Sequence, residues 1–245
     1  MLTLTKRIEK DFLGERELPT DVYYGIQTLR ATENFPITGL TIHSSLIKAM
    51  GIVKKSAALA NMEVGLLSEE IGHAIVQAAE EVMEGKWDSQ FIVDPIQGGA
   101  GTSINMNANE VIANRALEIL GHEKGNYQIV SPNTHVNMSQ STNDAFPTAM
   151  HISILNLINE LLNTMEAMKV VFEDKAKQFA HIIKMGRTHL QDAVPIRLGQ
   201  EFEAYSRALA RDIKRIASTR ENLYEVNMGA TFNRCNAFSG CYTKY

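Results

Sequence analysis

The sequence is short of cysteine and of long apolar runs, and each shortage excludes a class of protein. Cys235 and Cys241 are the two cysteines among 245 residues, too few for the disulfide framework of a small secreted domain. Their separation by five residues is not that of a standard zinc site. No apolar run approaches the roughly 18 residues that a membrane-spanning helix needs, and residues 1–15 lack the apolar core of a signal peptide. We therefore expect a cytoplasmic protein with no membrane partner.

Charge of one sign is not in excess either. Lysine and arginine number 24 against 28 aspartates and glutamates, which gives a formal net charge of −4. Such a balance offers no large basic surface to a polyanion. We expect neither nucleic acid nor an anionic membrane as a partner.

Several catalytic signatures are also missing. The sequence has no HExxH pair, no paired-aspartate metal cluster and no Gly-x-Ser-x-Gly elbow. The glycine-rich residues 98–101 are not followed by the Gly-Lys-Ser/Thr of a phosphate-binding loop. Hydroxyls, amides and backbone N–H groups remain, and these bind carboxylates without needing a metal. A small dicarboxylate is therefore chemically plausible as a partner, and no metal site is expected.

Apolar residues recur at three- and four-residue intervals through most of the chain, which predicts an all-α, mainly helical fold. Helices are expected from Ser45 onward, over residues 68–84 and over about 107–120. Asn107 and Glu110 resemble a capping box at the start of the third helix.

The longest periodic pattern covers residues 154–182, with apolar side chains at alternating four- and three-residue steps. Such a stripe packs against neighbouring helices at shallow crossing angles, and residues 202–223 supply a second stripe of matching length. Pro147 fits only near a first helical turn, so the first long helix should begin shortly before it. Between the two stripes, Gly186 and Pro195 predict a short polar hinge.

Residues 139–144 lie at the expected start of the first long helix and are rich in side chains that favour helix N-caps. A helix N-terminus exposes N–H groups and a partial positive charge, so it is suited to hold an anion. We interpret this segment as one wall of a carboxylate-binding site. Two further polar segments have a structural explanation that weighs as much as a role in binding. Residues 101–107 can be a flexible loop leading into a helix, and residues 186–192 can be a hinge whose polar side chains satisfy its own backbone. His189 alone is more typical of a structural histidine than of a catalytic one.

Three long segments nevertheless resemble the signatures of the aspartase/fumarase superfamily. They are GGAGTSINMNANE at 98–110, SPNTHVNMSQSTND at 131–144 and KMGRTHLQD at 184–192. The resemblance extends over about residues 7–231, and EVNMGAT at 225–231 is similar to the aspartate ammonia-lyases of the bacillus type. It implies reversible elimination of ammonia from L-aspartate to give fumarate, with no cofactor, in a homotetramer whose sites are shared among subunits.

The resemblance also assigns roles to individual residues. The positions that match the family's substrate-binding residues are Thr102, Ser141, Thr142, Asn143, Thr188 and His189. The first three correspond to groups that grip the β-carboxylate, and the other three surround the amino group and the other end of the substrate.

The same resemblance implies two domains, and the chain differs from the family's pattern in two places. It implies a mostly helical N-terminal lyase domain at 1–140 and the first part of a central helical-bundle domain at 141–231. Residues 232–245 carry no periodicity and replace a glycine-rich continuation, and the family's later Gly-Ser-Ser-x-Met-Pro loop with its serine base is absent. No catalytic base is therefore expected among these residues. We expect a frameshift or premature stop, and a chain that is inactive alone.

Two alternatives stay open at this point. Class II fumarase, which hydrates fumarate to malate, is close to the same pattern, although it more often has Gly-Thr-Gln and Ser-Ser-Asn-Asp at the corresponding places. A non-catalytic, truncated helical fragment is the other alternative. In that case the stripe over residues 154–182 would lack partner helices and promote self-association.

Overall fold

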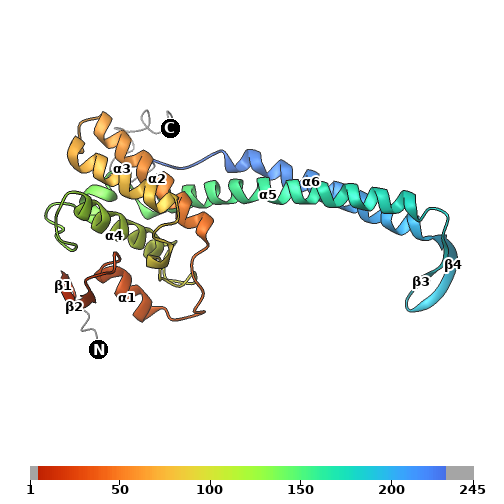
Figure 1. Cartoon of the computed structure of the whole chain (residues 1–245), viewed down its shortest axis with the longest axis horizontal. Coiled ribbons are helices and arrows are strands. Elements are labelled where there is room, and N and C mark those ends of the chain that lie inside the picture. The colour runs from red at the N-terminus through yellow and green to blue at the C-terminus, as the bar shows by residue number, and fades with distance from the viewer. Residues whose placement is uncertain (1–4, 230–245) are drawn as a thin grey trace. The chain divides into compact units, whose positions relative to one another are not determined.

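The computed structural model describes residues 5–229, and helices dominate them (Figure 1). This confirms the mainly helical fold. The described residues form two units: 5–153 together with 226–229, and 154–225. We treat the two units separately. The proposed division at 1–140 and 141–231 remains a prediction, and the segment 232–245 with both cysteines lies outside the described residues.

The first unit contains one small hairpin and most of the helices. The hairpin pairs β1 (Lys6–Asp11) with β2 (Gly14–Pro19) in antiparallel register. The helices are α1 (Ile26–Asn34), α2 (Ser44–Glu63), α3 (Glu69–Met83), α4 (Thr102–Ile119) and the start of α5 (Thr142–Gln178). A short 3₁₀ turn at Asp88–Gln90 and a π-helical turn at Pro132–Val136 connect them.

Helix α4 is the central element of this unit's core. Ala108, Val111, Ile112 and Leu117 are completely buried on it, and α3 packs against the same helix. Because α4 is buried on nearly all sides, polar residues as well as apolar ones lie inside. The prediction that this helix begins at Asn107 was wrong.

The predicted capping box on α4 was also wrong, for a physical reason. Helix α4 begins at Thr102, so Asn107 lies within it, and its buried amide pairs with the connection before the helix: Nδ2 donates to the Gln90 carbonyl at 3.0 Å. Glu110 caps a different helix. Its carboxylate accepts hydrogen bonds from the backbone N–H groups of Gly25, Gln27 and Thr28 at 2.9, 2.9 and 3.0 Å.

Gly25 is required at this remote cap. An added Cβ there would lie 2.5 Å from the Tyr127 hydroxyl oxygen and 2.7 Å from the Glu110 carboxyl carbon. A second buried carboxylate, Glu9, accepts from the Ile26 N–H at 2.9 Å. The N-terminus of α1 is therefore held by acidic side chains from β1 and α4, which suits the partial positive charge at a helix start.

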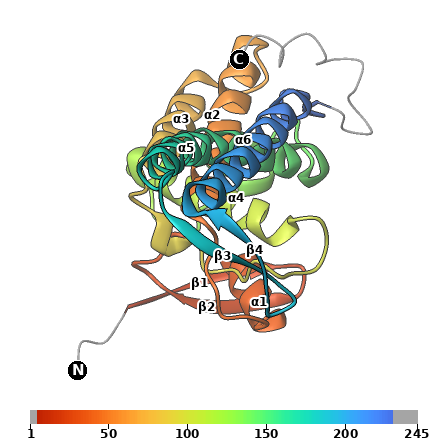
Figure 2. The same ribbon diagram turned by 90° about the vertical axis from the view of Figure 1, so that its right-hand side faces the viewer.

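The second unit contains most of α5, the hairpin β3 (Ile183–Thr188) and β4 (Gln191–Arg197), and α6 (Leu198–Leu223). Its two helices lie side by side (Figures 1 and 2). Both long helices were predicted from their apolar stripes, and both are confirmed. Rings from the two helices meet, with Phe179 and Phe202 5.4 Å apart and Phe172 and Tyr205 5.9 Å apart between centroids.

The hinge predicted between the long helices is instead an antiparallel hairpin. Its two-residue turn, His189-Leu190, has positive φ at both positions, 49° and 63°. Such a turn matches the twist of paired strands, but it usually contains glycine or asparagine. The strands are almost entirely exposed, so no alternation of buried and exposed residues marked them in the sequence.

Among the described residues, no helix is long and apolar enough to cross a membrane.

Candidate functional site

The start of α5 is capped by its own sequence. The Ser141 Oγ accepts a hydrogen bond from the Asn143 N–H at 3.2 Å, and the Asp144 carboxylate accepts from the Ser141 N–H at 2.9 Å. Ser141 is thus the N-cap, with its hydroxyl bonded to the N2 N–H, and Asp144 at N3 reaches back to the N-cap N–H as the acidic residue of a capping box does. The prediction that residues 139–144 open a long helix is therefore confirmed. Ser141 and Thr142 are partly exposed there and Asn143 is exposed.

Pro147 lies in the second turn of this helix rather than the first. It has no N–H to donate to the carbonyl four residues earlier, that of Asn143. Asn227 supplies the missing donor, because its side-chain Nδ2 lies 2.8 Å from the Asn143 oxygen. The segment after α6 thereby holds the start of α5 in place, and the Gly229 N–H adds a contact to Asp144 at 3.3 Å.

The hydroxyl of Thr142 is fixed by α4. Asn105, which is buried, donates from Nδ2 to Thr142 Oγ1 at 3.0 Å. Among the described residues, the hydroxyls of Ser141 and Thr142 each accept a hydrogen bond and donate none. Each therefore keeps its own O–H as a donor for a ligand, which is the arrangement that an anion requires.

Thr102 is brought toward the same helix start by the glycine loop before α4. Gly101 has a φ of +81°, and an added Cβ would lie 2.4 Å from the ring of Phe146. Only glycine allows both the left-handed backbone and this close packing on the first turns of α5. Thr102 is the first residue of α4, is exposed, and precedes Asn105 by about one helical turn.

Thr188 and His189 belong to the second unit. Thr188 ends β3 and pairs with Gln191, and His189 begins the exposed turn of the hairpin. The left-handed φ of His189 and of Leu190 is uncommon for residues other than glycine, and such backbone positions recur at functional sites. Thr102, Ser141, Thr142 and Asn143 all lie in the first unit.

Sequence reasoning missed a buried lysine behind the start of α5. Lys54 on α2 is completely buried, and its ammonium contacts three amide oxygens: Asn105 Oδ1 at 2.7 Å, Asn137 Oδ1 at 2.9 Å and Gln140 Oε1 at 2.9 Å. Burial lowers the pKa of Lys54 to about 7, and the nearby charge of Asp144 opposes that shift. The sequence did contain a sign that Lys54 is buried, because this residue follows Met50 by four positions on the apolar face of α2.

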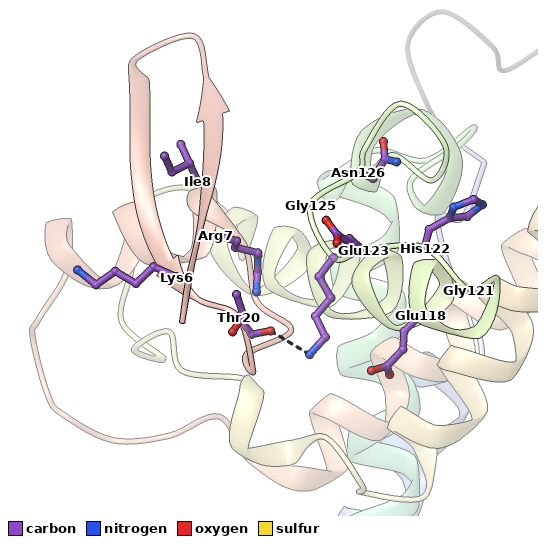
Figure 3. A pocket seen from close by; sticks show the side chains of 11 residues that line it. Lys6, Arg7, Ile8, Thr20, Glu118, Gly121, His122, Glu123, Gly125 and Asn126 are labelled. Carbon is purple, nitrogen blue, oxygen red and sulfur yellow. Dashed lines mark hydrogen bonds between the residues drawn. The ribbon is translucent and has the colours of Figure 1, made fainter. Parts of the chain in front are cut away.

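A hollow lies elsewhere in the first unit, and none of the predicted site residues lines it. It has a volume of about 990 Å³ and lies between the β1 strand and the end of α4 (Figure 3). Its cations are already engaged. Arg7 donates to the carbonyls of Val22 and Tyr24, and Lys124 donates to the Thr20 carbonyl and lies 3.8 Å from the Tyr23 ring centroid. The side chains of this hollow thus tie the hairpin to α4.

Within residues 5–229, no group of three or more histidine, cysteine, aspartate or glutamate side chains is arranged to hold a metal ion.

Comparison with known proteins places this chain in a family. A family model described as lyase matches residues 14–238. The chain belongs to this lyase family. Aspartate ammonia-lyase from a Bacillus species is 74% identical over 225 residues, and the one from Bacillus subtilis is 73% identical. Each alignment covers 92% of this chain, and it covers 48% and 47% of the two relatives. The chain therefore spans about half the length of the curated lyases it matches.

Solved structures agree with the lyase fold. Fumarate lyase:delta crystallin from Brucella melitensis aligns over 98% of this chain and 54% of its own, with a TM-score of 0.89 and 47% identity. Class II fumarase from Schistosoma mansoni aligns over 93% of this chain and 48% of its own, with a TM-score of 0.84 and 36% identity.

Proposed function

We propose that this chain supplies the carboxylate-binding part of an aspartate ammonia-lyase, which eliminates ammonia from L-aspartate to give fumarate. The observation that carries the proposal is the start of α5. There the Ser141 and Thr142 hydroxyls are held as acceptors, so that both O–H groups remain as donors, at the positive end of a helix. The identity to aspartate ammonia-lyases of Bacillus favours aspartate over other dicarboxylates.

The chemistry explains why such donors are needed. The reaction removes a proton from the carbon beside the β-carboxylate, and the electron pair of that C–H bond moves into the carboxylate. The resulting enediolate carries two negative charges, so preorganised hydrogen-bond donors stabilise it more than they stabilise the substrate. The C–N bond then breaks, the carbon–carbon double bond of fumarate forms, and the amino group leaves as ammonia.

The proposal assigns Thr102, Ser141 and Thr142 to the β-carboxylate. Asn143, at the exposed start of α5, and the hairpin residues Thr188 and His189 are proposed to hold the amino group and the other end of the substrate. None of these side chains is proposed as the base that removes the proton. Proximity alone does not make a hydroxyl or an imidazole an effective general base.

A polypeptide of these 245 residues is therefore expected to give no turnover by itself. The test is to express it together with the remaining half of the Bacillus subtilis aspartate ammonia-lyase and to follow fumarate by its ultraviolet absorbance. Fumarate formed from L-aspartate, and lost when Thr142→Val is introduced here, would support the proposal. Turnover by the 245 residues alone would contradict it.

Class II fumarase is the second candidate, and the structural similarity to the Schistosoma mansoni enzyme favours it. The two candidates differ in the leaving group, water or ammonia, while the β-carboxylate is treated alike. The same assembly should be assayed with L-malate. Fumarate production from malate but not from aspartate would assign the chain to fumarase instead.

We further propose a homotetrameric, cytoplasmic enzyme. The support is the row of large apolar side chains that α5 leaves exposed in the second unit, among them Leu161, Met168 and Val171. Exposed apolar surface of this kind is typical of an interface between helices. Size-exclusion chromatography with light scattering checks it. A chain that associates yet forms no active assembly with the remaining half of the Bacillus subtilis enzyme would instead be non-catalytic.

A further inference from the structure

Lys54 lies within hydrogen-bonding distance of three amide oxygens, one from α4 and two from the turn before α5. Its Nζ lies 2.7 to 2.9 Å from the side-chain oxygens of Asn105, Asn137 and Gln140, and the lysine is completely buried. An ammonium has three N–H donors and no acceptor, so three oxygens satisfy it fully. A neutral amine has two N–H groups, and one oxygen would then lack a donor. The geometry is that of the charged form, which Lys54 adopts below its lowered pKa of about 7.

This arrangement determines which end of each amide faces the lysine. Because Lys54 only donates, Asn105 must turn its oxygen toward Nζ, and its NH₂ then points the other way. That NH₂ donates to Thr142 Oγ1 at 3.0 Å and lies 3.3 Å from Asn137 Oδ1. If Asn105 were turned over, its oxygen would face Thr142 and would accept the hydroxyl proton.

We propose that Lys54 is a positioning residue: through Asn105 it holds the Thr142 hydroxyl as an acceptor on its inner side, so that the O–H donates to a bound carboxylate. This rests on the proposed function. The chain of contacts runs from α2 through α4 to the start of α5, and all its members lie in the first unit. The lysine determines that Asn105 donates and Thr142 accepts in the hydrogen bond between them. It touches neither substrate nor reacting atoms.

If Lys54 had only a structural role, the direction of the Asn105–Thr142 hydrogen bond would not affect anion binding. Asn105→Asp tests this, because it reverses that hydrogen bond and still gives the lysine a partner. The aspartate has the shape of asparagine and pairs with the lysine, so the fold is retained. It has no N–H to give to Thr142, and the hydroxyl proton then turns inward to the carboxylate. Anion binding should be lost although the core is intact.

The first readout needs no ligand and uses the full 245-residue chain. In the wild-type chain the Thr142 hydroxyl proton faces solvent and exchanges too fast to be seen by NMR. In Asn105→Asp it should become protected and observable. In Lys54→Met the Asn105 side-chain amide protons should lose their protection, while Lys55→Met, on the same helix with its side chain paired to Glu80, should leave them unchanged. A Thr142 hydroxyl that stays unprotected in Asn105→Asp overturns the positioning role.

The second readout is binding of succinate, an unreactive dicarboxylate, followed by the amide signals of residues 141–143. Asn105→Asp should weaken binding about tenfold, since a hydrogen bond to a charged acceptor is lost. Lys55→Met should bind as the wild type does. Wild-type binding that Asn105→Asp leaves unchanged also overturns the positioning role. A wild-type chain that binds no succinate contradicts instead the carboxylate site proposed above, and the hydroxyl readout still decides the role of Lys54.

Discussion

Asn227 donates a hydrogen bond to the Asn143 carbonyl oxygen at 2.8 Å, and Pro147 is the reason that this oxygen has room for it. In an unbroken helix the N–H of residue 147 would occupy that carbonyl. The loop after α6 thus replaces the helix hydrogen bond that Pro147 cannot make, beside the proposed substrate-binding residues. The sequence shows the proline and the asparagine, but it does not show that the asparagine compensates for the proline.

This relationship predicts a coupling between two substitutions. Asn227→Ala should lower the free energy of unfolding by about 1 kcal/mol, since one hydrogen bond at a partly exposed carbonyl is lost. In a Pro147→Ala background the helix supplies its own N–H, so the same substitution should cost almost nothing. A double-mutant cycle by urea denaturation measures the difference. Equal costs in both backgrounds would show that the two side chains act independently.

Lys54 predicts a pH dependence of stability. Burial lowers the pKa of Lys54 to about 7 from the 10.5 of an unfolded chain, so between these values the unfolded state binds the extra proton. The free energy of unfolding should therefore rise with pH through this window, by at most about 1.4 kcal/mol per pH unit. Below pH 7 the penalty of the buried charge is fully present.

The test of this pH dependence is urea denaturation at several values between pH 7 and 9. Asn105→Asp places a carboxylate beside Lys54 and should raise its pKa, which flattens the slope. Lys55→Met should keep the slope of the wild type, because Lys55 is partly exposed and paired with Glu80. A wild-type chain with no slope would mean that Lys54 stays charged throughout this range.

We predict a large loss of stability when Glu110 is replaced by glutamine, which has nearly the same shape. Its carboxylate accepts from three backbone N–H groups at the start of α1, and Glu110→Gln would turn an NH₂ toward at least one of them. We expect the free energy of unfolding to fall by about 2–3 kcal/mol, with faster hydrogen exchange in α1. The exposed Glu123→Gln, on the loop after α4, is the matched control and should change stability by less than about 0.5 kcal/mol.

The aromatic contacts of the second unit predict a separate effect. Phe202 on α6 lies between Phe172 and Phe179 of α5, with ring centroids 6.3 and 5.4 Å away. Phe202→Ala should destabilise the pairing of the two helices by about 2 kcal/mol, because a partly buried ring is removed. Tyr205→Phe keeps its ring and should be nearly neutral. Amide exchange in α6 measures both variants, and equal exchange rates in the two would contradict the prediction.

The elements that the sequence predicted best are those with long apolar periodicity. The α5 and α6 stripes define their helices because burial on one face repeats every turn. Helix α4 was placed five residues late, since the buried Asn105 and Asn107 look like residues of a loop until their partners on other elements are known. Local patterns do not contain such long-range partners.

The same limit applies to the candidate site. The place of Ser141 and Thr142 at a helix start was predictable because such a start has a local signature, whereas their role in binding remains a proposal. The burial of Lys54 had a local signal, but its role did not, because that role depends on three amides that lie 51, 83 and 86 residues away in sequence. The hairpin turn at His189 was missed for another reason: its residues are those that type I′ turns usually avoid.

The cap on α1 has a consequence for the order of folding. A nine-residue helix is too short to be stable by itself in water, and the carboxylate that completes this one lies 85 residues after Gly25. Closing so long a loop costs chain entropy before the contact is gained. Helix α1 should therefore form late, after α4 is in place, and a newly made chain should leave residues 26–34 open to proteases until Glu110 has been synthesised.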